Sequence, residues 1–462
     1  MNDMERLAQL RDEVPRGVIP VRAETALRTA IQAEKASASS ALGILWARVR
    51  WLVTSWTRGH LWASWIAPLA AAAAVTTVIV GTPAALHAIR GDRAISPPAA
   101  PGQGRDHHAT VYVAVPGIDG AFSPVSVVVP IRAATNKALR PIRTGNDPSA
   151  IAVTPDGKTV YVADQTSAAV TPIDVATNTA RPVIKAGYRP GTIVITPDGT
   201  TGYVVDDGAA HNREGVTVTP FWTADGSVLR PIVVGSIPTA IAITPDGKTL
   251  YIAAVADGGS VIPVQVATNT TLPPVTVGQV PTAIAITPDG KTAYVATMGG
   301  RGSSWVTPVQ VATNTALPAI TTGRMPDAIA ITPDGRTAYV ANSVSGTVTP
   351  IRVATNTALP AIRTGRDPKA IAITPDGRTA YVVNSLSGTV TPIRVATNTA
   401  LRPVHVGSDP VAIAITPDGR TAYVVNSLTG TVTPIQVATN TALRPVHVGG
   451  SPTAIAIVAA DG

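Results

Sequence analysis

A four-residue motif, Thr-Pro-Asp-Gly, recurs seven times, with its aspartate at positions 156, 198, 246, 289, 334, 376 and 418. Successive copies are separated by 42, 48, 43, 45, 42 and 42 residues, and a near-constant period of this length indicates stacked supersecondary units. Proline presets φ at the second position of a turn, aspartate can accept from its own backbone, and glycine tolerates positive φ. We interpret the motif as a turn that the fold needs once per unit, and not as a calcium ligand, because a hard cation needs about six to eight converging oxygens.

One unit of the repeat, residues 370–407, reads as four short strands separated by turns. The strand segments are AIAIT, TAYVVN, TVTPIRV and ALRPVHVG, and the intervening segments are PDGR, SLSG and ATNT. The strand segments are rich in Val, Ile, Thr and Tyr, and none shows a helical period. Four antiparallel strands per unit, here termed A to D, predict an all-β fold in which each unit is one blade of a β-propeller.

Counting the strand markers gives the number of blades. Strand A and the tyrosine of strand B each occur eight times between residues 109 and 462, the first unit begins at strand B near Thr110, and the chain ends with a lone strand A, Ala454 to Val458. A ring uses both fragments, because the terminal A strand completes the blade begun by the first B, C and D strands and leaves no open edge. Eight blades are therefore favoured. A seven-bladed ring of residues 150–449 is the alternative, and it would leave four strands without a blade.

The segment TAYVVNSLSGTVTPIRVATNTALRPVHVGSDPVAIAITPDG resembles the YVTN-type propeller repeat of bacterial and archaeal surface proteins. The resemblance covers nearly all of residues 109–462, and it implies a β-propeller, related to WD40-like repeat folds, and an exported location. The sequence departs from the family in strand C, where every copy carries a proline, from Pro130 to Pro434. Because proline lacks the N–H that an interior strand uses, we expect a bulge or an early end to C–D pairing in every blade.

The segment 61–89, LWASWIAPLAAAAAVTTVIVGTPAALHAI, contains no charged residue. A bilayer core needs about 20 apolar residues as helix, so this segment is predicted to be one transmembrane helix. Three tryptophans precede it and two more, Trp62 and Trp65, lie at its start, as at a membrane interface, and a small excess of arginine on that side places the N-terminus in the cytoplasm. Residues 1–60 are then a cytoplasmic region with short helices, which resembles the lead-in of actinobacterial single-pass proteins, and residues 90–108 are a Pro/Gly/Ala-rich linker.

Composition excludes several classes of function. The chain has no cysteine, which excludes disulfides, thiolate metal sites and cysteine nucleophiles. Its net charge is +8, of which only +4 falls in residues 109–462, so dedicated nucleic-acid binding is disfavoured. Residues 301–462 hold twelve Lys/Arg against seven Asp/Glu, which leaves a weaker alternative. In that alternative the ring binds an anionic cell-wall polymer or nucleic acid through Arg324, Arg366 and Arg402.

In a propeller, the A–B and C–D turns share one face, and the B–C and D–A connections share the other. The TPDG and ATNT turns are repetitive, whereas the connections on the second face vary, and variation within a repeat array is where a specific function can lie. Three groups of polar residues on that face are ligand-binding candidates. They are the strand-B ends Asp164, Asp206, Asn342, Asn384 and Asn426, the loop residues Asp207, His211 and Glu214, and the D–A residues Arg324, Arg366, Asp367 and Asp409.

No nucleophile elbow, phosphate loop or His/Glu metal spacing is present in the sequence. We therefore expect no cofactor and no metal. The favoured hypothesis is a binding or scaffolding module for an unidentified protein, peptide or cell-wall ligand, held outside the cytoplasm at the cell membrane. The alternative is a propeller enzyme of the lactonase or hydrolase type, with Asp164, Asp206, Asp207, His211 or Glu214 at the mouth of the ring's channel.

Overall fold

A computed structural model describes residues 109–117, 125–206, 216–235, 237–255 and 258–459. All of them belong to one compact unit. Over these residues no helix is long and apolar enough to cross a membrane. The predicted membrane helix, residues 61–89, and the predicted regions 1–60 and 90–108 lie outside the described ranges.

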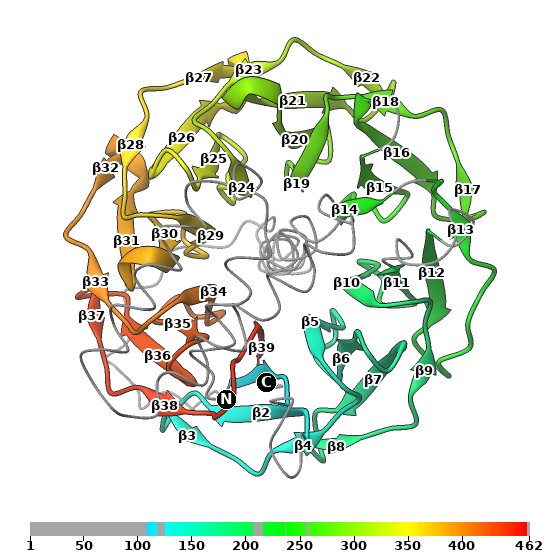
Figure 1. Ribbon diagram of the computed structural model, residues 1–462, viewed down its shortest axis with the longest axis vertical. Helices are drawn as coiled ribbons and strands as arrows, with labels where there is room; N and C mark the ends of the chain where they lie inside the picture. The colour runs from blue at the N-terminus through cyan, green and yellow to red at the C-terminus, as the bar shows by residue number, and fades with distance from the viewer. Residues whose placement is uncertain (1–108, 118–124, 207–215, 236, 256–257, 460–462) are drawn as a thin grey trace, which may run out of the picture. The chain divides into compact units, whose positions relative to one another are not determined.

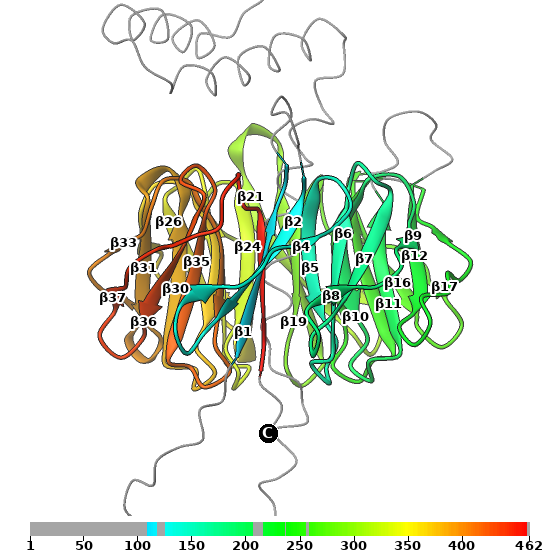
Figure 2. The same ribbon diagram turned by 90° about the horizontal axis from the view of Figure 1, so that it is seen from below.

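The described residues form eight antiparallel sheets arranged in a ring around one axis (Figure 1). The strands run through the thickness of the ring, as Figure 2 shows from the side. The innermost A strands are β5 (Pro148–Val153), β10 (Pro190–Ile195), β14 (Pro238–Ile243), β19 (Val280–Ile286), β24 (Pro326–Ile331), β29 (Pro368–Ile373), β34 (Pro410–Ile415) and β39 (Ala454–Val458). The B strands are β1 (Thr110–Val115), β6 (Thr159–Asp164), β11 (Thr201–Asp206), β15 (Thr249–Ala254), β20 (Thr292–Met298), β25 (Thr337–Asn342), β30 (Thr379–Asn384) and β35 (Thr421–Asn426).

The outer half of each blade consists of a six- or seven-residue C strand and a D strand in short pieces. The C strands are β2 (Val127–Arg132), β7 (Ala169–Asp174), β12 (Thr217–Trp222), β16 (Ser260–Gln265), β21 (Ser304–Gln310), β26 (Thr347–Arg352), β31 (Thr389–Arg394) and β36 (Thr431–Gln436). The first D pieces are β3 (Lys137–Ala138), β8 (Thr179–Ala180), β17 (Thr270–Thr271), β22 (Thr315–Ala316), β27 (Thr357–Ala358), β32 (Thr399–Ala400) and β37 (Thr441–Ala442). The second D pieces are β4 (Ile142–Arg143), β9 (Ile184–Lys185), β13 (Ile232–Val233), β18 (Val275–Thr276), β23 (Ile320–Thr321), β28 (Ile362–Arg363), β33 (Val404–His405) and β38 (Val446–His447).

The ring closes as the sequence predicts. The C-terminal strand β39 pairs antiparallel with β1, so the last strand of the chain completes the blade that also contains β2, β3 and β4. We number the blades 1 to 8, starting from this closing blade. The described chain confirms an all-β propeller with eight blades, and the seven-bladed alternative is wrong. Short 3-10 turns, η4 (Gly300–Gly302), η5 (Val353–Thr355), η6 (Ser385–Ser387) and η7 (Val395–Thr397), occur in some of the connections.

The strand C prolines coincide with the interruption of strand D. In blade 1 the carbonyl of Pro130 accepts from the amide of Leu139, which lies between the two D pieces. In an antiparallel sheet the N–H and C=O of one residue point to the same neighbour. The N–H that Pro130 lacks would therefore point at the gap in strand D, and its register partner on the other side, Tyr112, loses nothing. The predicted loss of continuous C–D pairing is confirmed, and it explains why proline is tolerated here.

The core lies between the blades. Strand A alternates alanine and isoleucine, and period-2 alternation sends the two residue types to opposite faces of the sheet. Between blades 7 and 8, Ala370 and Ala372 of one blade pack with Ile413 and Ile415 of the next in a single buried cluster, together with Tyr381. At strand A, each of these blades thus offers alanine to one neighbour and isoleucine to the other, which fits strands that converge toward an axis.

Candidate functional site

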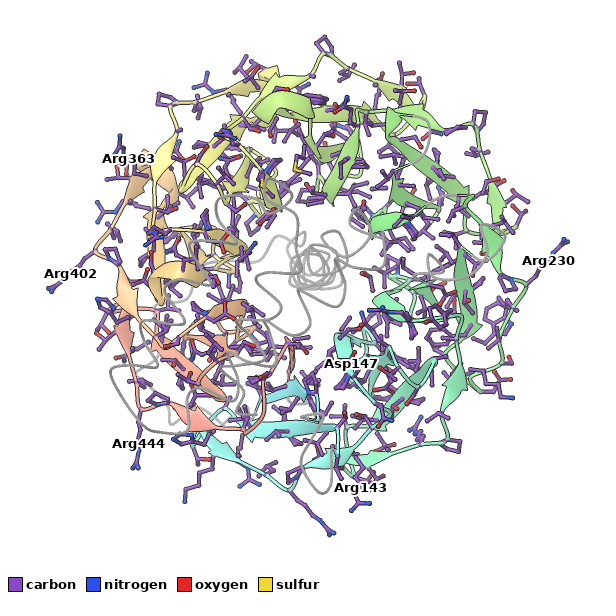
Figure 3. All side chains as sticks on the ribbon, viewed as in Figure 1. Arg143, Asp147, Arg230, Arg363, Arg402 and Arg444 are labelled. Atoms are coloured by element: carbon purple, nitrogen blue, oxygen red, sulfur yellow. The ribbon has the colours of Figure 1, made fainter. Side chains whose placement is uncertain are left out.

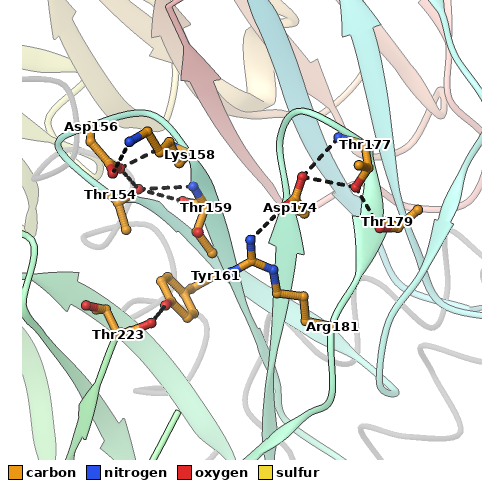
Figure 4. Close-up of polar contacts among 10 residues, drawn as sticks. All are labelled: Thr154, Asp156, Lys158, Thr159, Tyr161, Asp174, Thr177, Thr179, Arg181 and Thr223. Carbon is orange, nitrogen blue, oxygen red and sulfur yellow. Dashed lines mark hydrogen bonds and ion pairs between the residues drawn. The ribbon is translucent and has the colours of Figure 1, made fainter. Parts of the chain in front are cut away.

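The TPDG turns use their aspartate inside the turn itself. In the first copy, Asp156 Oδ1 accepts from Thr154 Oγ1 at 2.6 Å and from the Lys158 amide at 3.0 Å, while Thr154 Oγ1 accepts from the Thr159 amide at 3.1 Å (Figure 4). The other oxygen, Asp156 Oδ2, lies 3.8 Å from the Lys158 ammonium. Burial acts to raise the pKa of Asp156, but these hydrogen bonds outweigh it and hold the pKa below its usual value. The interpretation of the motif as a turn is confirmed.

The ATNT turns form a hydrogen bond from each blade to the one before it, and we call this contact the inter-blade latch. Their asparagine adopts a left-handed conformation, as at Asn440 with φ 52°, and its Oδ1 accepts from the buried tyrosine of the preceding blade, Tyr381, at 2.6 Å. The closing pair joins Tyr423 of blade 8 to Asn136 of blade 1 at 2.7 Å. Over the described chain the exception is Tyr161, which donates to the carbonyl of Thr223, because the turn of blade 3 reads TADG (Figure 4). The A–B and C–D turn face therefore has structural roles for its repeated polar residues.

The predicted strand-B residues lie at the opposite end of the blades, and their side chains point into the sheet. Asp164, Asp206, Asn342, Asn384 and Asn426 are all 0% exposed. Each hydrogen-bonds a threonine of strand C in its own blade, as Asp164 Oδ2 accepts from Thr171 Oγ1 at 2.5 Å and Asn384 Nδ2 donates to Thr391 Oγ1 at 2.9 Å. The D–A glycines pack directly against these side chains, so that a Cβ at Gly365 would lie 2.7 Å from Asn384 Cβ. These five residues are in place at the strand ends, but none is presented at a surface.

The two buried aspartates are electrostatically unusual. Burial raises the pKa of Asp164 and of Asp206 to about 6, against the hydrogen bonds from threonine that act to lower it. One oxygen of each carboxylate, Oδ1, is buried without a hydrogen-bond partner. Asp164 and Asp206 lie in different blades, at the ends of strands β6 and β11. Asp207, His211 and Glu214 lie outside the described residues, and the described chain contains no group of three or more His, Cys, Asp or Glu that could hold a metal ion.

The D–A candidates lie in the connections that enter strand A. Arg324 and Arg366 are exposed, and Asp367 and Asp409 adopt φ values of 59° and 54° immediately before a proline. Asp409 Oδ1 accepts from Ser385 Oγ at 2.5 Å, which joins the D–A connection between blades 7 and 8 to the B–C loop of blade 7. The B–C and D–A connections thus form one surface, here termed the loop face.

Sequence reasoning missed an ionic cluster on the loop face. Lys369 Nζ lies 3.0 Å from Asp327 Oδ2 and 3.3 Å from Asp367 Oδ1, which joins blades 6 and 7. Asp327 is 1% exposed and its Oδ1 has no hydrogen-bond partner. Burial raises the pKa of Asp327, and Lys369 opposes that shift only in part. Burial acts to lower the pKa of Lys369, but the two carboxylates raise it above its ordinary value.

Sequence reasoning also missed a row of exposed aliphatic side chains. Val344, Leu386 and Leu428 are 53%, 65% and 46% exposed, and they occupy the same B–C loop position in the consecutive blades 6, 7 and 8. Ser345, which follows Val344, accepts from the Arg324 backbone amide at 2.7 Å, and Ser387, which follows Leu386, accepts from the Arg366 backbone amide at 2.6 Å. An exposed arginine therefore accompanies each of these two aliphatic residues. We call Val344, Leu386 and Leu428 the apolar row. The signal was available in the recurring Ser-Val/Leu-Ser/Thr-Gly loop.

Two protein families match parts of the chain. Residues 108–306 match a family described as YNCE-like beta-propeller, and residues 304–407 match the family described as lactonase, 7-bladed beta-propeller. A comparison with curated proteins finds no matching sequence. These two matches and the eight sheets together support a β-propeller family.

Solved structures share the fold at low sequence identity. Dihydro-heme d1 dehydrogenase NirN, in complex with DHE, is 15% identical with a TM-score of 0.63, over 78% of this chain and 77% of that chain. Hydrazine synthase of Kuenenia stuttgartiensis is 20% identical with a TM-score of 0.53, over 64% and 97%. A putative 6-phosphogluconolactonase from Bacteroides fragilis is 19% identical with a TM-score of 0.52, over 78% and 100%. These likenesses concern the β-propeller fold.

Proposed function

We propose that the propeller is a binding module whose loop face receives a protein or peptide partner. The observation that carries the proposal is the apolar row, in which three consecutive blades expose an aliphatic side chain at the same position. Contiguous exposed apolar residues mark interaction sites, and arginine is enriched at the centre of protein interfaces. Because Arg324 and Arg366 accompany the row, the preferred partner is a segment that carries both apolar and acidic side chains.

The other face supports this choice by contrast. Its repeated aspartates, threonines, tyrosines and asparagines are engaged in turn and inter-blade hydrogen bonds, as the sets around Asp156 and Tyr381 illustrate. A ligand there would have to compete with bonds that hold the ring together. The loop face carries such bonds as well, but it also offers aliphatic and arginine side chains that point to solvent.

The experiment is a selection of random peptides on phage against the ring, residues 109–462, followed by affinity measurements on single peptides. We expect the selected peptides to combine apolar and acidic residues, and Leu386→Asp to weaken them by at least about tenfold, the effect of removing one interface anchor. The matched control is Val183→Asp, since Val183 is 58% exposed but lies between the two D pieces of blade 2, away from the loop face. Peptides that tolerate Leu386→Asp, or lose binding equally with Val183→Asp, would refute the proposal.

The proposal includes a place for the ring in the cell. A charge-free segment at residues 61–89 and the resemblance to YVTN-type surface repeats support a single-pass anchor with the propeller outside the cytoplasm. Protease added to intact cells should cleave the propeller if this topology holds. A propeller that is degraded only after the cells are lysed would refute the extracytoplasmic location without affecting the role of the apolar row.

A further inference from the structure

Positive charge gathers on the outer wall of four consecutive blades. We define the basic wall as the C strands, C–D turns and D strands of blades 6, 7, 8 and 1, residues 347–364, 389–407, 431–449 and 127–145. These segments contain nine Lys/Arg and no Asp or Glu. The nine are Arg132, Lys137, Arg140, Arg143, Arg352, Arg363, Arg394, Arg402 and Arg444, and all are exposed. The equivalent segments of blades 4 and 5, residues 260–278 and 304–323, contain no charged residue.

The cations fall into rows because the blades repeat. Arg402, Arg444 and Arg140 occupy the same D-strand position in blades 7, 8 and 1, between the two D pieces. Arg363 and Arg143 occupy the outermost position of the second D piece, at β28 and β4, and histidines occupy it in the two blades between. Figure 3 shows Arg363, Arg402, Arg444 and Arg143 projecting outward along one arc of the circumference. Each row therefore follows the curve of the ring.

These charges are not neutralised by neighbours. On the turn face, Lys and Arg lie beside the aspartate of their own TPDG turn, as Lys291 lies 3.5 Å from Asp289. In blade 2 an aspartate replaces the arginine at the end of strand C, and Asp174 forms an ion pair with Arg181 (Figure 4). No ion pair with any described residue involves a cation of the basic wall. The basic wall therefore concentrates positive charge on one part of the ring, although residues 109–462 carry a net charge of only +4.

We propose that the basic wall binds a linear polyanion that has no aromatic bases, such as a phosphodiester-linked or uronate-bearing glycan polymer. Eight of the nine cations are arginine, and the guanidinium fork matches phosphate and carboxylate oxygens in pairs. Rows that follow the circumference suit a flexible chain that can bend around a convex wall. The four segments of the wall contain no Phe, Trp or Tyr, whereas single-stranded nucleic acid is held largely by base stacking on such side chains.

This site is separate from the apolar row. The sequence hypothesis for an anionic polymer grouped Arg324 and Arg366 with Arg402, but the structure places the first two in D–A connections of the loop face and Arg402 on the wall. The proposals for the apolar row and for the basic wall can therefore be refuted independently of each other. A propeller that binds peptides through Leu386 could bind a polyanion through Arg402 at the same time.

The test measures binding of the full-length protein, in a non-ionic detergent, to fluorescently labelled poly(glycerol phosphate) and to labelled polygalacturonate across a salt series. The two probes separate a phosphate source of the anion from a carboxylate source. The wall variant Arg140→Gln/Arg402→Gln/Arg444→Gln removes three cations from one row. Each neutralised phosphate contributes about 0.7 to the slope of log affinity against log salt, so this slope should fall by about 2. At about 0.1 M salt the loss corresponds to roughly 100-fold in affinity.

The charge-matched control is Lys158→Gln/Lys248→Gln/Lys291→Gln, which removes three cations that lie beside aspartates on the turn face. It should keep the affinity and the salt slope. If the wall variant fails to fold, Arg143→Gln/Arg363→Gln tests the second row, with an expected fall in slope of about 1.4. Three results would overturn the proposal. These are absence of binding to both polymers, equal losses in the control, or tighter binding of oligodeoxythymidine than of poly(glycerol phosphate).

Discussion

Replacing the buried aspartates Asp164 and Asp206 by asparagine should stabilise the protein at neutral pH. Both side chains are 0% exposed, and each leaves one carboxylate oxygen without a partner. Asparagine already fills the equivalent position in three other blades, where its Nδ2 donates to a strand C threonine, as Asn384 Nδ2 does to Thr391 Oγ1. The Asn384 Oδ1 also accepts from the Gly365 amide, whereas the Oδ1 atoms of Asn342 and Asn426 have no partner. The double variant Asp164→Asn/Asp206→Asn therefore places in blades 2 and 3 a side chain that the fold accommodates elsewhere.

The magnitude follows from the pKa of the two groups. In the unfolded chain each carboxyl titrates near 3.8, whereas burial holds the folded pKa at about 6. The folded state thus keeps its proton over a range in which the unfolded state has lost it. Stability falls as pH rises from about 4 to about 6, and the penalty is complete above that range. A rise of about two pKa units corresponds to about 3 kcal/mol in the free energy of unfolding for each aspartate. Above pH 7 the gain in stability for each aspartate replaced should approach that value.

The assay is urea unfolding of the wild-type ring and of the double variant at a series of pH values from 4 to 8, followed by circular dichroism and tyrosine fluorescence. The wild-type midpoint should decline between pH 4 and pH 6 relative to the variant, and the two curves should differ most at pH 8. Asp198→Asn is the control, because its carboxylate lies in an exposed TPDG turn and hydrogen bonds hold its pKa below the usual value. A double variant that is no more stable than wild type at pH 8 would refute the reasoning.

Three further predictions concern the ring itself. Tyr381→Phe should lower the free energy of unfolding by about 1 kcal/mol, since it removes the hydrogen bond to Asn440; urea unfolding measures the loss, and an unchanged midpoint would show that the latch contributes nothing. Lys369→Met should destabilise by about 3–5 kcal/mol because it leaves Asp327 buried without its cation. The double variant Asp327→Thr/Lys369→Thr places at both positions the residue that blade 5 carries at the equivalent position, Thr282, and should come close to wild type in the same assay. Removal of residues 454–462 should abolish the soluble folded ring in size-exclusion chromatography, because β1 loses its partner β39; removal of residues 460–462 alone is the control, and a folded monomer without β39 would contradict the closure argument.

The fold was predictable because its signals are local. A turn such as Thr154–Gly157 is specified within a few residues, and the alternation of Ala370, Ile371 and Ala372 fixes which side chain meets which neighbour. The inter-blade latch was not predictable in the same way. Tyr381 and Asn440 lie 59 residues apart, and only the stacking of blades brings a tyrosine of one repeat to the turn of the next.

Side-chain direction is what the sequence left open at the candidate site. The polar residue at the end of strand B was placed at the correct end of the blade, but whether Asn384 points to solvent or into the sheet depends on the D–A connection. Gly365 closes over it and leaves no room for exposure. The reverse holds for Leu386, since an aliphatic residue in a β repeat is expected in the core, yet a tight turn at η6 places it 65% exposed.

The eight blades provide an internal comparison that explains why the strand-B ends differ. Where strand C carries threonine before its proline, as at Thr171, the last residue of strand B is polar, as at Asp164, which accepts a hydrogen bond from that threonine. Where strand C carries Val129 or Ile262 instead, strand B ends in Val115 or Ala254. A residue selected to contact a ligand would have no reason to vary together with a buried threonine. The pairing therefore marks these positions as part of the sheet, and it shifts the search for ligand contacts outward to the side chains that no neighbouring strand requires.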